Sequence, residues 1–377
     1  MRVIRTTEIQ KITHLERGNL HLPGNLSDAQ VYWPLESKQA DSLTRLDIFH
    51  LDRTTIDIFE EKTHFFKAFG AFHMGLRLPN ASELMLIYSA SIAMEVVFNE
   101  LRNVGASKVQ MIHPTFDATY HTAKRHRLEV TPVEEERVFS GVPTWCSGFP
   151  PDALILTVPN NPTGRTFSTE AFTSLCVACV RDGVKLVLDC CFRAYEQDLV
   201  DHYEIIQRTG VEAAIIEDTG KLFNIFDIKL GILWATTGWR ARLIEVHKDF
   251  ILEAPLLNLL VLRQLLAADP TYGKILRDRV ARNRDLANAV LSSYNLKPIG
   301  AHNSGIQLYE LPDGLSARNL CSAAHALGLG VVEADGFYWA TLPADNYIRI
   351  ALARTDSTFN HQLEILSTAI EHLTERQ

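Results

Sequence analysis

The chain has 377 residues, of which 46% are hydrophobic and 22% are charged, and its formal net charge is −8. The acidic balance argues against a nucleic-acid partner, and the longest apolar stretch, residues 254–268, is interrupted by Asn258 and Arg263 and is too short to cross a membrane. Six cysteines in a chain of this length do not suggest a disulfide framework, and the charged N-terminus has no signal-peptide core, so a cytoplasmic protein is expected.

The first forty residues show no periodicity and are rich in polar side chains, which fits either a loose tail or a lid over an active site. Strands and helices then alternate, as in βαβ units of a mostly parallel sheet. The expected strands are residues 84–88, 108–113, 153–158, 184–188 and 213–217, and the expected helices include 92–104, 170–182 and the apolar stretch 254–268.

From about residue 270 the pattern changes to that of a smaller α+β unit. A long charged helix is followed by strands at 304–311, 328–334 and around Arg349, and by helices at 316–327 and 356–374. The sequence therefore predicts an α/β protein in three parts. These are an N-terminal lid segment (1–40), a large domain with the mostly parallel sheet (41–270) and a small C-terminal domain (271–377).

Two lysines follow one of the buried strands. Lys221 comes after the strand end and the turn Asp-Thr-Gly, and Lys229 lies eight residues further on. Open α/β sheets bind their ligands at the carboxyl ends of the strands. A partly desolvated amine in that place reacts with an aldehyde, and a second cation suits a phosphate. Pyridoxal phosphate (PLP), an aldehyde with a phosphate group, fits both lysines, although a lysine alone is more often a solvated surface charge.

Further motifs accompany Lys221. Asn-Asn-Pro-Thr-Gly stands at 160–164, Asp189 ends a strand, and Arg349 interrupts an apolar alternation. In this order the motifs resemble the fold type I aminotransferase superfamily of PLP-dependent enzymes. The resemblance implies a fold type I PLP-dependent transferase and a homodimer in which each subunit completes the other's active site. A regulator that only binds an effector is disfavoured, because Lys221 and Asp189 are both present and no DNA-binding module is attached.

The resemblance assigns residues to the cofactor ring. Asp189 would pair with the protonated pyridine nitrogen, Asn161 would bond the phenolic oxygen, and Phe116 would stack on the ring. Core packing is the ordinary role of such a phenylalanine. The chain departs from many aminotransferases at Phe192, where a tyrosine hydroxyl often assists the phenolic oxygen.

The phosphate is expected at the start of a helix. Ser89, Ala90 and Ser91 follow a strand there, and their hydroxyl and backbone N–H groups can receive an anion. A simple N-cap at Ser91 would look the same. Lys229 stands where arginine is commoner, which keeps the positive charge but loses the bidentate fork.

Four residues are predicted to bind the substrate. The Arg349 guanidinium matches an α-carboxylate, with a buried structural ion pair as the alternative. Asp218, three residues before Lys221, stands where aminotransferases usually have a small hydroxyl residue, and with Glu16 it could hold a guanidinium. Asp28 belongs to the same set.

The chain is further similar to the PLP-dependent arginine oxidases (hydroxylases and desaturases) and the related arginine cyclases. The similarity lies in residues 88–95, 113–117, 132–136, 216–221 and 349–352, and more faintly in Thr13, Glu16, Asn25 and Asp28.

Two positions in the N-terminal segment bear on the reaction. The hydroxylases carry a histidine where this chain has Gln30, which cannot act as a general base. The resemblance therefore implies first a cyclase that converts γ-hydroxyarginine into enduracididine, with an arginine oxidase and an ordinary aminotransferase as alternatives. Lys221 would move the Cα proton with Thr13 and His14 as lid partners, although a lone histidine there is as often inert. No metal site is expected.

Overall fold

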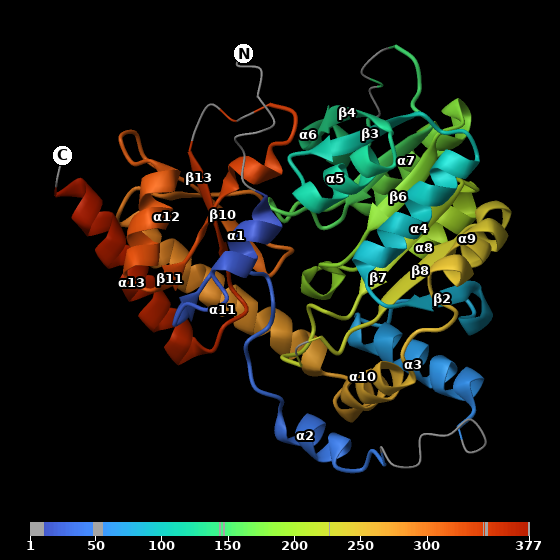
Figure 1. Ribbon diagram of the computed structural model, residues 1–377, viewed down its shortest axis with the longest axis horizontal. Helices are drawn as coiled ribbons and strands as arrows, with labels where there is room; N and C mark the ends of the chain where they lie inside the picture. Colours follow the sequence, from blue (N-terminus) through green and yellow to red (C-terminus); the bar gives the residue numbers. More distant parts are fainter. Residues whose placement is uncertain are drawn as a thin grey trace.

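The computed structural model describes residues 11–47, 56–142, 145, 148–225, 227–341, 343 and 346–375. Residues 1–10 of the expected lid lie outside the described residues. A large sheet with its helices occupies one half of the molecule and a smaller sheet with its helices the other (Figure 1). Helix α1 (Ile12–Gly18) lies between the two halves and contacts elements of both.

The large sheet has seven strands in the order β2-β8-β7-β6-β5-β3-β4. Their bounds are β2 Leu84–Ile87, β3 Lys108–His113, β4 Glu129–Glu134, β5 Ala153–Thr157, β6 Lys185–Asp189, β7 Ala213–Asp218 and β8 Gly231–Ala235. Strands β3 to β7 are parallel, whereas β8 is antiparallel to both β2 and β7. The predicted mostly parallel sheet is therefore confirmed, and β4 and β8 are strands that the sequence pattern did not predict.

Helices cover both faces of this sheet, as βαβ crossovers require. The helices of this unit are α3 Ile58–Phe72, α4 Ala90–Asn103, α5 Asp117–Arg125, α6 Glu135–Phe139, α7 Thr169–Asp182, α8 His202–Thr209, α9 Thr237–Phe250 and α10 Leu256–Ala268, of which α3 and α10 pack against each other. Helix α7 begins at the Ser168 cap, whose Oγ accepts from Ala171 N at 3.1 Å, and ends at Gly183, which has the left-handed φ of 69°. None of the described helices is long and apolar enough to cross a membrane.

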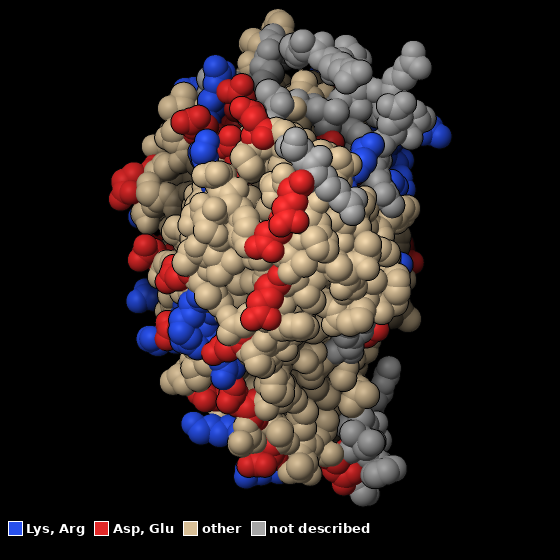
Figure 2. Space-filling view, turned by 90° about the vertical axis from the view of Figure 1, so that its left-hand side faces the viewer, with Lys and Arg blue, Asp and Glu red and all other residues tan. Residues whose placement is uncertain are grey.

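The smaller sheet is antiparallel, in the order β12-β13-β10-β9. Its strands are β9 Lys297–Ile299, β10 Ile306–Glu310, β12 Val332–Glu333 and β13 Tyr347–Ala351, and its helices are α11 Tyr272–Ser292, α12 Ala317–Ala326 and α13 Asp356–Thr374. From the side of this unit, Figure 2 shows a broad surface made mostly of uncharged residues, with a few acidic side chains among them. The predicted strand 328–334 is corrected to two short strands, because β11 (Leu329–Gly330) pairs away from this sheet.

The partner of β11 is β1 (Gly24–Asn25), in the N-terminal segment. This pairing continues as backbone hydrogen bonds from Leu26 N to Gly330 O (2.8 Å) and from Tyr32 N to Ala353 O (2.9 Å). The polar segment is therefore built into the smaller unit, and helix α2 (Ser37–Leu43) follows it against α10. A loose tail is excluded for this part of the chain.

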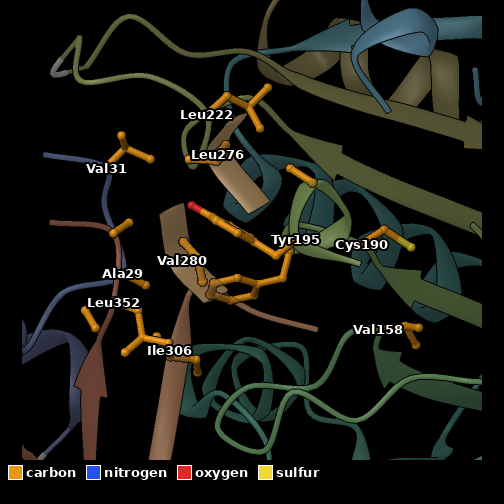
Figure 3. Close-up of a cluster of buried hydrophobic side chains, with 14 of the residues drawn as sticks. Ala29, Val31, Val158, Cys190, Tyr195, Leu222, Leu276, Val280, Ile306 and Leu352 are labelled. Atoms are coloured by element: carbon orange, nitrogen blue, oxygen red, sulfur yellow. The ribbon is translucent and has the colours of Figure 1, made fainter. Parts of the chain in front are cut away.

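A single hydrophobic cluster joins the parts. It contains Ala29 and Val31 from the N-terminal segment, Tyr195 and Leu222 from the loops of the large sheet, and Val280 from α11, together with other side chains (Figure 3). The region where the two sheets and the N-terminal segment meet is consequently a packed core and holds the surrounding loops in place.

Candidate active site

The predicted site residues gather at one edge of the large sheet because the strands that carry them are neighbours. Strands β5, β6 and β7 are adjacent and parallel, with Thr157 opposite Asp189 and Asp189 opposite Ile216. The carboxyl ends of these strands therefore lead to Asn161, Asp189 and Lys221 along the same edge. This arrangement is the one expected from the sequence.

Lys221 is half-buried in the turn after β7. Its backbone carbonyl accepts a hydrogen bond from Tyr195 Oη (2.8 Å), and its Nζ lies 5.9 Å from the centre of the Phe192 ring. With the Gln30 amide turned so that both ends find partners, its oxygen lies 3.2 Å from Lys221 Nζ and its nitrogen 2.5 Å from Gly220 O. Gln30 thus reaches the Lys221 amine directly, a contact that the sequence did not reveal.

Asp189 ends β6 as a carboxylate without a salt bridge among the described residues. Its Oδ1 accepts from Cys191 N at 3.1 Å. Burial raises the pKa of Asp189, while the hydrogen bonds from Cys191 and the charge of Lys221 act in the opposite direction. A protonated ring nitrogen placed here would supply the missing cation.

The start of α4 forms a cradle next to β8. Ser89 is the N-cap, and its Oγ accepts from Ile92 N at 3.4 Å. A Cβ at Gly231 would lie 2.7 Å from the carbonyl carbon of Ser89 and 3.0 Å from Ala90 N, so only glycine lets the loop lie against the strand. Ser91 is exposed at this end, which leaves its hydroxyl accessible. The start of α4 thus shows the plain N-cap, and a phosphate there would meet the Ser91 hydroxyl, because the Ala90 N–H already donates to Asp218 Oδ2 at 2.8 Å.

Asp218 projects from the end of β7 into this cradle. Its Oδ2 accepts from Ala90 N at 2.8 Å and its Oδ1 from Gly220 N at 2.5 Å. Burial raises its pKa, whereas these two hydrogen bonds and the charges of Lys221 and Lys229 lower it. Asp218 therefore lies at the expected phosphate end of the site, beside Ala90, as well as near Lys221.

Arg349, on β13, is fully buried and already has partners. Its Nη2 donates to Glu16 Oε1 at 2.6 Å and to the Ser27 carbonyl, and its Nη1 donates to Asn161 Oδ1 at 3.3 Å. Its Nε has no partner among the described residues. The ion pair named as the alternative for Arg349 is thus present, and it joins two residues predicted to hold opposite ends of the substrate.

Phe116 and the asparagine pair come from neighbouring loops. Phe116 is half-buried, and its ring centre lies 6.5 Å from that of Phe337, whose ring also lies 5.1 Å from the Arg349 guanidinium carbon. Asn160 is fully buried, and its Oδ1 accepts from Thr115 Oγ1 at 3.1 Å. Asn160 therefore fixes the loop that carries Phe116, while Asn161 faces Arg349.

Asp28 has its hydrogen-bonding capacity committed to the protein. Its Oδ2 accepts from Tyr32 Oη (2.6 Å) and Asn25 Nδ2 (2.7 Å), and its Oδ1 lies 3.3 Å from Arg354 Nη2. Burial alone would raise its pKa, but Arg354 and the hydrogen bonds lower it below the ordinary value. These contacts give Asp28 a role in anchoring the N-terminal segment.

Helix α1 carries Thr13, which is half-buried, and His14, which is exposed. The helix is fastened at its start by Asp117 of α5, whose Oδ2 accepts from Ile12 N at 3.0 Å. Burial raises the pKa of Asp117 to about 6. The sequence placed Asp117 in a family motif but gave no sign that it anchors α1.

A cavity of about 250 Å³ lies between the N-terminal segment and the loop after β7. Its walls include Glu16, Asp28, Gln30, Gly220 and Lys229. Polar groups of both signs therefore converge beside the turn that holds Lys221, as expected of a small-molecule site.

The family model for aminotransferase class I and II matches residues 81–366. The chain belongs to this family. None of the curated proteins matches the chain. The expected fold type I PLP-dependent transferase is thereby confirmed, and PLP is the cofactor of this aminotransferase-family enzyme.

Solved structures share its fold. MppP soaked with the product 2-ketoarginine is 23% identical, with a TM-score of 0.83 over 92% of this chain and 99% of that chain. Aspartate aminotransferase from Thermus thermophilus with maleate is 15% identical, with a TM-score of 0.77 over 98% and 100%. LysN, the α-aminoadipate aminotransferase from Thermus thermophilus complexed with N-(5'-phosphopyridoxyl)-L-leucine, is 17% identical, with a TM-score of 0.77 over 98% and 96%.

The aminotransferase-family site fits PLP in its own geometry. Lys229 lines the cavity and has no ion pair among the described residues, so it could pair with a phosphate. The start of α4 lies against β8 because Gly231 has no side chain, and the Asp189 carboxylate has no cationic partner among the described residues. Lys221 would hold the aldehyde carbon. The individual ligand roles of these residues stay predictions.

Proposed function

We propose that this PLP enzyme acts on a guanidino amino acid and converts γ-hydroxyarginine into the cyclic-guanidine amino acid enduracididine. PLP, when bound, withdraws electrons from the substrate's α-carbon. The chain's own residues would bind the two ends of the substrate, move the Cα proton and keep water out. The observation that carries the proposal is the charge balance around Asp218.

Asp218 is a half-buried carboxylate whose nearby positive charges come from Lys221 and Lys229. Cofactor binding would engage both lysines, one with the aldehyde and the other with the phosphate. Asp218 would then lack a cation, because its hydrogen bonds come from the uncharged backbone at Ala90 and Gly220. Each carboxylate oxygen can accept a further bond, so a substrate guanidinium would restore the balance.

Gln30, next to the Lys221 amine, favours a reaction in which no side chain other than Lys221 transfers a proton there. Its amide can orient Lys221 Nζ but cannot take up or release a proton at neutral pH. Lys221 would therefore carry the Cα proton unaided there. The chain differs in this respect from hydroxylases, which have a histidine at the position of Gln30.

The proposed reaction is balanced without an oxidant. The Cγ–O bond of the substrate breaks, a guanidine nitrogen forms a bond to Cγ, and the hydroxyl leaves with the proton of that nitrogen as water. Helix α1, fastened at its start by Asp117, would cover the site and exclude bulk water during these steps.

A second candidate is an oxidase or transaminase that forms a keto product from arginine. It is favoured by the fold similarity to MppP, whose structure contains the product 2-ketoarginine. This candidate uses the same guanidinium and carboxylate contacts and differs in what becomes of the electrons at the α-carbon.

A closed oxygen-electrode cell separates the two. The PLP-bound protein is incubated with arginine and, separately, with γ-hydroxyarginine, and products are identified by mass spectrometry. Loss of one water from the hydroxylated substrate without oxygen uptake is expected. Oxygen uptake with arginine would show an oxidase in place of the cyclase. A keto product that forms only with an amino-group acceptor would show a transaminase.

A further inference from the structure

A cluster of ionisable side chains is buried next to the cofactor site. Its members are Arg193, Glu196, His202, Tyr203 and Glu217, each at most 2% exposed. Arg193 Nε donates to Glu217 Oε1 at 2.7 Å, and Tyr203 Oη donates to the same oxygen at 3.2 Å. On its other side, Arg193 Nη2 lies 3.0 Å from His202 Nδ1.

The hydrogen bonds fix the charges in this cluster. Arginine only donates, so His202 Nδ1 must be the unprotonated acceptor and the imidazole is neutral. Glu217 is the carboxylate that faces the guanidinium. Glu196 Oε2 lies 3.8 Å from Arg193 Nη1 and has no hydrogen bond among the described residues. Burial raises the pKa of both Glu196 and Glu217 to about 7, so distance distinguishes the two acids: Glu217, hydrogen-bonded to Arg193 at 2.7 Å, is the ion-pair partner of Arg193.

This ion pair ties together the two strand ends that carry the cofactor residues. Arg193 opens the short helix η3 (Arg193–Tyr195), four residues after Asp189, and Glu217 immediately precedes Asp218. Ladder pairing of β6 with β7 ends at Asp189 and Ile216. The Arg193–Glu217 bond therefore continues the connection between β6 and β7 past the point where their ladder stops.

The same short helix makes a second tie. Tyr195 Oη donates to the carbonyl of Lys221, and its ring packs so closely on Gly305 that a Cβ there would lie 2.9 Å from the ring. Helix η3 thus contacts the stretch 217–221 at both ends, once by an ion pair and once by a hydrogen bond. Figure 3 shows Tyr195 in the core between the sheet loops and α11.

We propose that Arg193, Glu217 and Tyr195 are positioning residues that set the spacing between the Asp189 carboxylate and the Lys221 amine, and thereby the affinity for PLP. Asp189 and Lys221 lie on separate loops, and PLP must meet both at once. A rigid spacer lowers the ordering cost of binding. The inference concerns the cofactor and does not depend on which amino acid is the substrate.

Tyr195→Phe and the double variant Arg193→Met/Glu217→Met test whether these three residues set the spacing between Asp189 and Lys221. The double change removes both charges together, which avoids a single unpaired buried ion. Matched controls are Tyr294→Phe, which loses a surface bond to Glu371, and Arg240→Met/Glu83→Met, which removes a part-buried pair remote from the spacer. The apoprotein is titrated with PLP by visible absorbance, and the pH midpoint of the bound cofactor's absorbance and the melting temperature are recorded.

Tyr195→Phe is expected to weaken PLP binding about tenfold and to shift the pH midpoint, whereas Tyr294→Phe should change neither. The double variant should weaken PLP binding further, unlike its control. If both site variants bind PLP as tightly as the wild type with the same pH midpoint, whatever their stability, the cluster is merely structural and the proposal fails. Should the double variant not fold, Tyr195→Phe alone decides.

Discussion

Glu16→Gln is expected to change which amino acids the PLP-bound protein prefers. Glu16 Oε1 lies 2.6 Å from Arg349 Nη2, and the side chains are 17% and 0% exposed. An amino acid that uses Arg349 for its α-carboxylate must first open this pair. Glutamine keeps the size of the side chain but removes its charge, so Arg349 becomes available at lower cost.

The magnitude follows from the geometry of the pair. A largely buried, charge-assisted hydrogen bond contributes about 2 kcal/mol, which is about 30-fold in a dissociation constant. Norleucine, which has no guanidinium, should therefore bind to the variant about 30-fold more tightly. Arginine should gain much less, because it loses one carboxylate that would hold its guanidinium.

The assay is a spectral titration of the PLP-bound protein with each amino acid. Glu60→Gln, a change to an exposed acid on α3, serves as the control and should alter neither constant. If Glu16→Gln tightens the binding of both amino acids by the same factor, Glu16 does not help to hold a guanidinium, and if both affinities stay unchanged, Glu16 does not block Arg349 either.

Four further outcomes are expected. Lys221→Ala should abolish the borohydride-reducible adduct with PLP, and a persistent adduct would place the reactive amine elsewhere. Asp218→Ala should weaken arginine binding far more than norleucine binding, whereas equal losses would speak against a guanidinium contact. The pKa of Asp117 is raised from 3.8 to about 6 in the folded protein, so its contribution to stability is present below pH 3.8 and lost as pH rises through about 6. Against Asp117→Asn as a pH-independent reference, urea unfolding should show the wild type losing about 1 kcal/mol between pH 5 and pH 7, and a constant difference would contradict the raised pKa. Sedimentation should show a homodimer, and a fully active monomer would refute the shared active site.

The sequence by itself determined the large sheet and the positions of the residues at its edge. Buried strands appear as short apolar runs, and the polar residue that ends each run, such as Asp189, must lie where the strand emerges. Parallel order then brings Asn161, Asp189 and Lys221 to one edge without any further information. Strands β4 and β8 escaped prediction, because periodicity alone does not separate a short strand from other short segments.

Only the tertiary structure decided how these residues are partnered. Glu16 and Arg349 are 333 residues apart, and their pairing depends on β1 joining β11, which no local pattern encodes. The seat of Asp218 at the start of α4 likewise depends on how β7 and β8 lie against that helix. Side-chain periodicity reports which face of an element is buried, whereas hydrogen-bond partners across the chain are chosen by packing and by the need to satisfy buried polar groups.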